Sequence, residues 1–90
     1  MIMPISKGFI LKHVGNEYMI IPTNETNVKL DTIYNINESA AYIYEKLCEG
    51  LNAKQISNKM CVVYVADPME LETDILEFIG ELKKRGIYYD

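Results

Sequence analysis

The sequence predicts an α+β domain of the winged helix-turn-helix type, in which a three-stranded antiparallel sheet is followed by three helices. Two patterns carry this prediction. Apolar and polar side chains alternate along much of residues 8–36, as in half-buried strands, whereas residues 37–86 repeat apolar side chains at the spacing of amphipathic helices. A block of strands before a block of helices is typical of α+β domains. A length of 90 residues indicates a single domain over residues 1–90.

The first two strands are expected to form a hairpin over residues 8–22. Gly15-Asn16 fits a two-residue type II′ turn, because glycine readily adopts the positive φ needed at the first central position. This turn fixes the register of the hairpin and places His13 opposite Tyr18. One face of the hairpin then carries Phe9, Leu11, His13, Tyr18 and Ile20.

The third strand is expected at Thr32–Ile36, where Tyr34 and Ile36 point to one face and Ile33 and Asn35 to the other. Ile87-Tyr88 either adds a short final strand or packs as a tail. We expect Thr32–Ile36 to lie at the edge of the small sheet. An edge strand leaves backbone donors and acceptors unpaired, and a second polypeptide can use them. The same edge is able to pair two copies of the chain, so a homodimer is an open alternative.

The first two helices have start and stop signals of their own. Asn37 caps the first helix, which ends at Gly50. Asn52 opens the second helix, with Gln55 as its capping-box partner. The buried stripes are expected at Ala40, Ile43, Tyr44 and Leu47 in the first helix and at Ile56, Met60 and Val63 in the second.

The third helix has the strongest start signal in the chain. Asp67 is its cap, Pro68 fits the first helical position, and Glu70 completes a capping box. The basic run 83–85 and then Gly86 mark its end. Its core stripe is expected at Leu71, Ile75, Phe78 and Leu82.

Leu76 and Ile79 widen this stripe to one side, and two interpretations of the wider face remain open. One is that a small domain wraps the third helix more fully. The other is that part of the face lines a groove beside the third strand. An extended peptide would bind in such a groove as an added strand, with apolar pockets giving specificity.

The acidic balance of the chain limits its partners. The net charge is −4, and Glu72, Glu77 and Glu81 would lie on the DNA-recognition surface of a winged helix. An acidic surface gains nothing from neutralising phosphates, so a nucleic-acid partner is not expected and a DNA-binding winged helix is the weaker alternative.

No segment approaches the ~20 apolar residues that span a bilayer, and the start of the chain lacks a signal peptide. We therefore expect no membrane partner and a cytoplasmic location.

Catalytic chemistry is not expected. The single histidine, His13, has no carboxylate or cysteine near it in the sequence that would form a catalytic or metal site. Cys48 and Cys61 lack C-x-x-C spacing and fall at or beside the apolar helix stripes, where free cysteine acts as a small hydrophobe. No phosphate-binding, Rossmann or nucleophile-elbow motif occurs. We therefore predict that the chain is not an enzyme and has no catalytic residue, metal site or cofactor.

The order of these segments resembles the PqqD family. The hairpin Phe9–Tyr18 followed by Pro22-Thr23 resembles the family's opening, and Ile36–Ala41 resembles its L-N-E-[ST]-A-[AG] segment. Tyr44 stands where the family has an aromatic residue, commonly tryptophan. The closing part of the pattern is matched by Tyr64–Asp67, Asp74-Ile75, Phe78-Ile79, Leu82 and Gly86-Ile87. The departures are an isoleucine for leucine at residue 36, a tyrosine for tryptophan at residue 44 and a lysine-rich final turn. They leave the subfamily open, and pyrroloquinoline quinone synthesis is not claimed.

The resemblance implies a non-catalytic recognition element for ribosomally synthesised and post-translationally modified peptides. Such a domain holds the leader segment of a precursor peptide against its third strand, beside the third helix, and presents it to a modifying enzyme, often a radical SAM protein. A winged-helix domain that docks a partner protein without holding a peptide is the alternative. The candidate peptide-binding residues are Thr32, Ile33, Tyr34, Asn35, Ile36, Ile75, Phe78, Ile79, Leu82 and Lys83.

Overall fold

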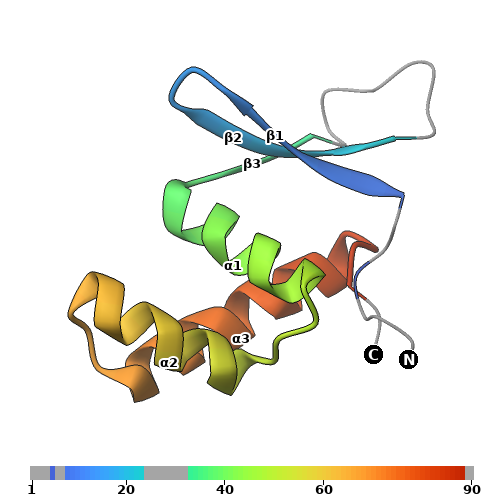
Figure 1. The fold of residues 1–90 in the computed structure, drawn as a ribbon. Coiled ribbons are helices and arrows are strands. Elements are labelled where there is room, and N and C mark those ends of the chain that lie inside the picture. The colour runs from blue at the N-terminus through green and yellow to red at the C-terminus, as the bar shows by residue number, and fades with distance from the viewer. Residues whose placement is uncertain (1–4, 6–7, 24–32, 89–90) are drawn as a thin grey trace.

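The computed structural model describes residues 5, 8–23 and 33–88 of the chain. Three strands precede three helices, and the predicted α+β order is confirmed (Figure 1). The elements are β1 (Phe9–Val14), β2 (Glu17–Pro22), β3 (Tyr34–Ile36), α1 (Glu38–Cys48), α2 (Ala53–Tyr64) and α3 (Pro68–Lys84). No helix in these ranges is long and apolar enough to cross a bilayer.

The hairpin forms in the predicted register. His13 pairs with Tyr18, and Gly15 begins the turn with a φ of 61°, as the first central position of a type II′ turn requires. β2 also pairs with β3, so the sheet has the order β1-β2-β3 and β3 is an edge strand. β3 begins at Tyr34, later than expected, and the predicted strand residue Thr32 lies outside the described residues.

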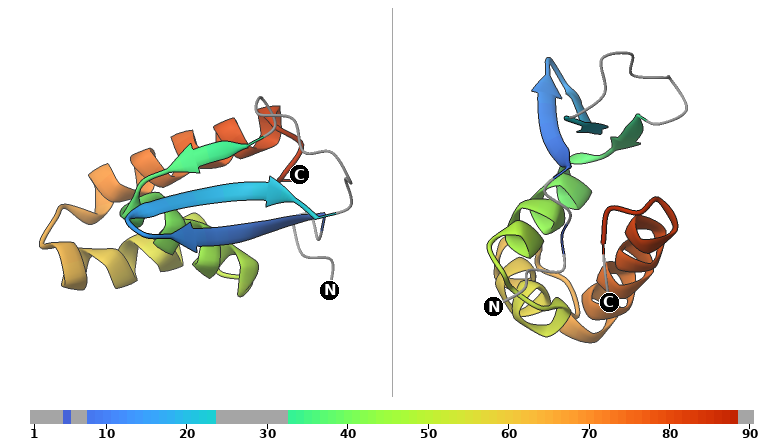
Figure 2. Two further views of the ribbon diagram at one scale, coloured as in Figure 1. Left: turned by 90° about the horizontal axis from the view of Figure 1, so that it is seen from above. Right: turned by 90° about the vertical axis from the view of Figure 1, so that its right-hand side faces the viewer.

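The sheet lies over the helices, with α1 next to it (Figure 1). Seen from above, β3 runs on the side of α3, and β1 lies on the opposite edge of the sheet (Figure 2). One sheet face and all three helices contribute to one core, because the alternating strands turn their apolar side chains toward the helices. Its fully buried large side chains are Ile20, Leu47, Ile56, Ile75, Leu82 and Ile87.

A short bridge joins the described segments near the two ends of the chain. Gly86 has a φ of 73° and ends α3, and the N–H of Ile87 then donates to the carbonyl of Leu82 at 2.9 Å. Ile87 is buried, and Tyr88 forms an antiparallel bridge with Ile5. The described tail therefore pairs with the start of the chain and leaves the edge of β3 uncovered.

All three predicted helix caps are present. The Asn37 side chain accepts from the N–H of Ala40 at 2.8 Å. Asn52 and Gln55 form the expected reciprocal capping box. Asp67 differs in detail, because it accepts from the N–H of Met69 rather than that of Glu70. The start of each helix is thus set by a local polar side chain.

We expect Asn52→Ala to lower the free energy of unfolding by about 1 kcal/mol, because it removes the side-chain half of this box. Asn58→Ala is the matched control, an exposed asparagine inside the same helix. It should leave stability unchanged or raise it slightly, since alanine has the higher helix propensity. Urea denaturation followed by circular dichroism measures both, and equal midpoints for the two variants would contradict the role of the box.

Two sequence-based assignments of burial were wrong in detail. Val63 is 64% exposed, because α2 ends at Tyr64 and its last turn extends past the core. Ala41 is buried, whereas Ala40 is only half-buried. Cys48 is exposed and lies beside the buried stripe of α1, as the sequence allowed. These errors lie where a helix stripe meets the border of the small core.

Candidate functional site

The open edge of β3 is the first feature of the site. Among the described residues, β3 pairs with β2 on one side and with no strand on the other. Its helix-facing residues Tyr34 and Ile36 are half-buried, whereas Asn35 is exposed. β3 therefore keeps one row of backbone groups available to another strand.

Hydrogen-bond alternation identifies these backbone groups. The N–H of Thr23 donates to the carbonyl of Gly8 at 2.8 Å, so this pair is hydrogen-bonded. In an antiparallel ladder bonded and non-bonded pairs alternate, so the backbone groups of Tyr18 and Ile20 point away from β1 and toward β3. Their partners are Ile36 and Tyr34.

The residue between these two partners is Asn35. Its N–H and C=O must therefore point away from β2, toward the open edge of β3. Its side chain lies on the sheet face away from the helices, because side chains alternate along a strand. Asn35 thus offers one backbone donor and one acceptor to an added strand, without using its side chain.

The C-terminal half of α3 contributes the second feature of the site. Tyr34 of β3 faces Phe78, with ring centroids 6.1 Å apart. The guanidinium carbon of Arg85 lies 3.9 Å from the centroid of the Tyr34 ring, close enough for a cation–π contact. Arg85 also donates from Nε to Oε1 of Glu81 at 3.3 Å. Side chains at the end of α3 therefore meet the first residue of β3.

Burial and the neighbouring Glu81 keep Tyr34 protonated, against the opposing charge of Arg85. Burial and the Glu81 carboxylate raise the pKa of the Tyr34 hydroxyl, and Arg85 opposes them only in part. The hydroxyl therefore remains a hydrogen-bond donor at neutral pH. Lys83, Lys84 and Arg85 all lie at this end of α3, and Lys83 places its Nζ 5.7 Å from the centroid of the Tyr88 ring. The arrangement can hold an extended polypeptide and favours one with a negative charge here.

A comparison with protein families decides the class of the chain. The family described as coenzyme PQQ synthesis protein D (PqqD) has a model that matches residues 17–87. This stretch begins at the first residue of β2, ends at the buried Ile87, and includes both β3 and α3. The chain belongs to the PqqD family.

A solved structure shares the fold of this PqqD-family chain. It is described as TbiB1 in complex with the TbiA(beta) leader peptide, and the two structures align with a TM-score of 0.76. The alignment covers 96% of this chain and 94% of that one, at 20% sequence identity. At this identity the likeness shows the fold alone. No curated protein sequence matches the chain.

The structure brings together only part of the site predicted for this PqqD-family member. Tyr34 and Phe78 are in contact. Ile33 directly precedes β3, Asn35 and Ile36 follow Tyr34 within it, and Lys83 lies at the end of α3. The other three α3 residues are in the core, with Ile75 and Leu82 0% exposed and Ile79 7% exposed. Their side chains pack in the core beneath the surface of the site, so Ile79 does not form an open groove wall.

Arg85 was outside the candidate set. Its position just after α3 predicts only a favourable interaction with the helix dipole, and Glu81 in the preceding turn predicts only an ion pair. The contact with Tyr34 depends on the distance between β3 and α3, which sequence spacing does not reveal. The only feature of the sequence that pointed to Arg85 as a site residue was the run of positive charges at residues 83–85.

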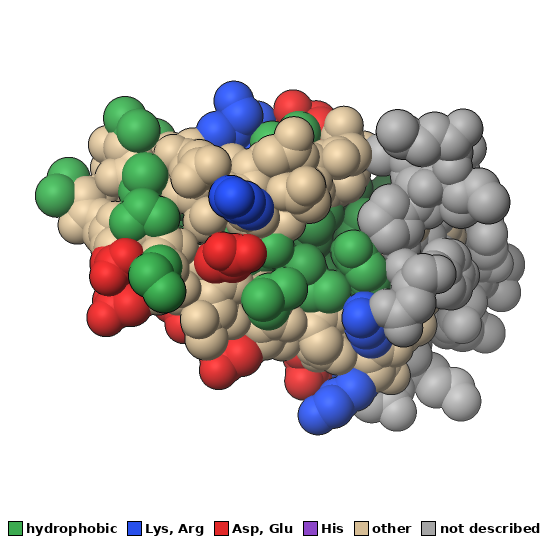
Figure 3. Space-filling view, turned by 90° about the horizontal axis from the view of Figure 1, so that it is seen from below, with side chains coloured by type: hydrophobic (Ala, Val, Ile, Leu, Met, Phe, Trp, Pro, Cys, Tyr) green, Lys and Arg blue, Asp and Glu red, His purple; other side chains and the backbone are tan. Residues whose placement is uncertain are grey.

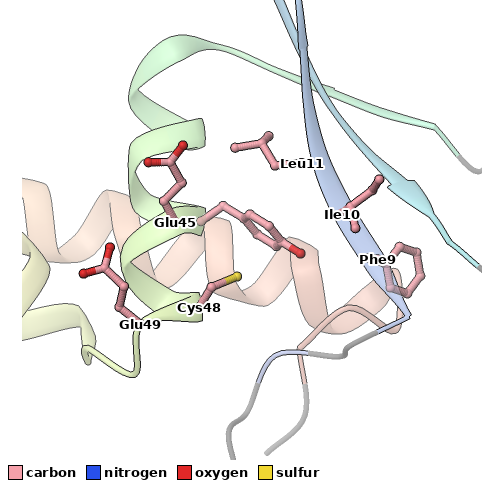
Figure 4. A pocket seen from close by; sticks show the side chains of 7 residues that line it. Phe9, Ile10, Leu11, Glu45, Cys48 and Glu49 are labelled. Carbon is pink, nitrogen blue, oxygen red and sulfur yellow. The ribbon is translucent and has the colours of Figure 1, made fainter.

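A second hollow lies at the opposite edge of the sheet. A pocket of about 590 Å³ opens between β1 and α1 (Figure 4). It is lined by Phe9, Ile10, Leu11, Tyr44, Glu45, Cys48 and Glu49. Burial, with smaller contributions from two glutamates, raises the pKa of the Cys48 thiol despite a hydrogen bond with Tyr44 that acts in the other direction. The thiol therefore stays protonated at neutral pH and is a poor nucleophile.

The remaining polar residues form no recognisable reaction centre. His13 stacks on Tyr18, with ring centroids 4.1 Å apart and an interplanar angle of 11°. Over residues 5, 8–23 and 33–88, no group of three or more histidine, cysteine or acidic side chains is placed to hold a metal ion. The features of the site suit binding, and the prediction that the chain is not an enzyme stays a prediction.

Proposed function

We propose that this PqqD-family chain is a non-catalytic peptide chaperone that binds the leader segment of a ribosomal precursor peptide by strand addition to β3. The observation that carries the proposal is the outward direction of the Asn35 N–H and C=O on an edge strand that no described residue covers. Membership of a family whose fold is shared with a leader-peptide complex supports the same class of ligand. The bound leader is then presented to a modifying enzyme, such as a radical SAM protein.

The energetics of this binding mode are modest for each contact and depend on their sum. Each main-chain hydrogen bond to the added strand contributes about 0.5–1.5 kcal/mol. Alternate leader side chains point toward the helices, where Tyr34 and Phe78 offer half-buried aromatic surface. Main-chain pairing thus supplies affinity for any extended peptide, and the aromatic surface selects among peptides.

The basic end of α3 adds a charge preference. Arg85 is fixed between Glu81 and the ring of Tyr34, so its guanidinium has lost much of its side-chain freedom before a peptide binds. A preorganised guanidinium forms strong hydrogen bonds with a carboxylate at a low further entropy cost. The leader segment is therefore expected to carry aspartate or glutamate where it passes this end of the helix.

The test is a calorimetric titration with the synthetic leader of the precursor encoded nearest to the gene for this chain. Arg85→Ala is expected to weaken binding about fivefold, because it removes both the charge and the stacking on Tyr34. Lys84→Ala removes the same charge next to it and should change the dissociation constant by less than about twofold. Equal losses for the two variants would mean that only overall charge matters.

The place of binding is tested separately by ¹⁵N amide shifts on the same titration. The Asn35 amide is expected to show a large change, whereas the Ile10 amide on β1, at the other edge of the sheet, should show little. A leader peptide that perturbs Ile10 and the pocket between β1 and α1 instead would contradict strand addition at β3. No binding at any site would leave the protein-docking alternative.

A further inference from the structure

Exposed apolar side chains gather where α2 meets α3, at one end of the molecule (Figure 3). In the described part of the chain, five of the eight exposed large hydrophobic residues lie in this corner. They are Val62, Val63, Tyr64, Val65 and Met69, and we call them the corner patch. Val65 and Met69 are 90% and 78% exposed, so the core does not account for them. A cluster of this kind marks an interaction surface.

The backbone at Val65 supports a role outside the core. Val65 caps the C-terminus of α2 with φ 49° and ψ 60°, in the left-handed region. Glycine is the usual residue at such a cap, and a β-branched side chain is especially unfavourable there. The sequence therefore keeps an exposed valine where glycine would suit the fold better. Strain of this kind concentrates at functional positions.

A pocket of about 180 Å³ adjoins the corner patch through Tyr64. It is lined by Tyr18, Glu38, Ala41, Tyr42, Glu45 and Tyr64, and we call it the tyrosine pocket. The rings of Tyr42 and Tyr64 meet edge to face with centroids 6.5 Å apart. Aromatic faces and carboxylates both attract cations, so this lining suits the end of a lysine or arginine side chain.

The tyrosine pocket keeps its negative character in the folded chain. Neither Glu38 nor Glu45 forms an ion pair with another described residue. Lys46 is not among the lining residues; it bonds Glu49 at 3.0 Å, and its Nζ lies 5.3 Å from the centroid of the Tyr42 ring. The Tyr42 ring thus already takes part in one cation–π contact, and Lys46 also interacts through space with Glu45. Glu45 is therefore partly balanced within the chain, whereas Glu38 remains to be neutralised by a partner.

We propose that the corner patch and the tyrosine pocket together dock the modifying enzyme, which covers the patch with an apolar recess and inserts a lysine or arginine side chain into the pocket. This inference rests on the proposed function. Charge favours such a partner over a second copy of the chain, because two copies of net charge −4 would bring like carboxylates together. The corner patch lies at the start of α3, whereas Tyr34 of β3 contacts Arg85 just after the other end of this helix, so the two surfaces are separate (Figure 1).

The test measures binding of the purified modifying enzyme encoded beside this gene by biolayer interferometry. Val65→Gly is expected to raise the melting temperature by about 4 °C, since glycine suits the left-handed cap, and yet to weaken enzyme binding about tenfold. A variant that becomes more stable but binds more weakly cannot be explained by unfolding. Glu38→Gln with Glu45→Gln should also weaken binding about tenfold and reduce its salt dependence.

The matched control is Asp74→Asn with Glu77→Gln, which removes the same charge from exposed positions on α3 and should change the dissociation constant by less than about twofold. Equal enzyme affinities for wild type, Val65→Gly and the Glu38–Glu45 variant would overturn the docking surface, as would an enzyme that does not bind wild type. A wild-type dimer that Val62→Glu dissociates in sedimentation experiments would also overturn it, by assigning the patch to a second copy.

Leader binding separates this inference from the proposed function. All variants of the docking surface should bind the synthetic leader with wild-type affinity, because none of them touches β3. If these variants bind both the leader and the enzyme as wild type does, only the proposed docking surface is contradicted. Loss of leader binding by the wild-type protein would instead remove the proposed function itself.

Discussion

Replacement of Asn35 by proline is expected to weaken leader-peptide binding about tenfold or more while the domain stays folded. The Asn35 N–H points to the open edge of β3, so proline removes a donor that an added strand would use and leaves the bonds between β2 and β3 intact. The proline ring also obstructs the approach of the peptide backbone. Edge positions with outward N–H groups are the positions in sheets that tolerate proline.

Asn35→Ala is the matched control for this prediction. It removes the exposed side chain and keeps the backbone N–H, so the dissociation constant should change by less than about twofold. Calorimetric titration with the leader measures both variants, and thermal melting checks that both remain folded. Equal leader affinities for Asn35→Pro and wild type would contradict strand addition at β3, regardless of how substitutions in α3 affect binding.

Leu82→Ala is expected to have the largest effect on stability, lowering the free energy of unfolding by about 3 kcal/mol. The Leu82 side chain is 0% exposed on α3, in the core between the sheet and the other helices. Truncation removes buried methyl groups and leaves a cavity. The backbone carbonyl of Leu82, which accepts from the N–H of Ile87, is kept in the variant, so the loss reports side-chain packing alone. In a domain of this size the loss corresponds to a fall in melting temperature of roughly 15 °C.

Leu76→Ala provides the comparison on the same helix. Leu76 is 54% exposed, so the same chemical change should alter the free energy of unfolding by less than about 0.5 kcal/mol. Differential scanning calorimetry measures the two transitions. A similar loss for both variants would mean that the packing of α3 differs from that described here.

The elements that local sequence determines were predicted well. The Gly15 turn fixed the hairpin register, and asparagine or aspartate caps set the starts of all three helices. These features depend on residues that are close in the sequence, where turn and cap chemistry acts directly. The expectation that β3 is an edge strand was also confirmed, because among the described strands it pairs with β2 alone.

The parts of the site that depend on tertiary distance were predicted less well. Ile79 was expected to line a groove and is 7% exposed, because the spacing of apolar residues gives the width of a helix face but not the depth of its burial. Arg85 was missed because its contact with Tyr34 joins residues far apart in the chain. Val65 carries no sequence signal for its left-handed conformation, since valine is seldom found there.

The bridge between Ile5 and Tyr88 has a consequence for larger proteins. A polypeptide that continued in both directions would enter and leave the domain close to this pair of residues. Domains with adjacent ends can be inserted into a host protein or circularly permuted with little strain. This fold is therefore suited to insertion into another protein as well as to existence on its own.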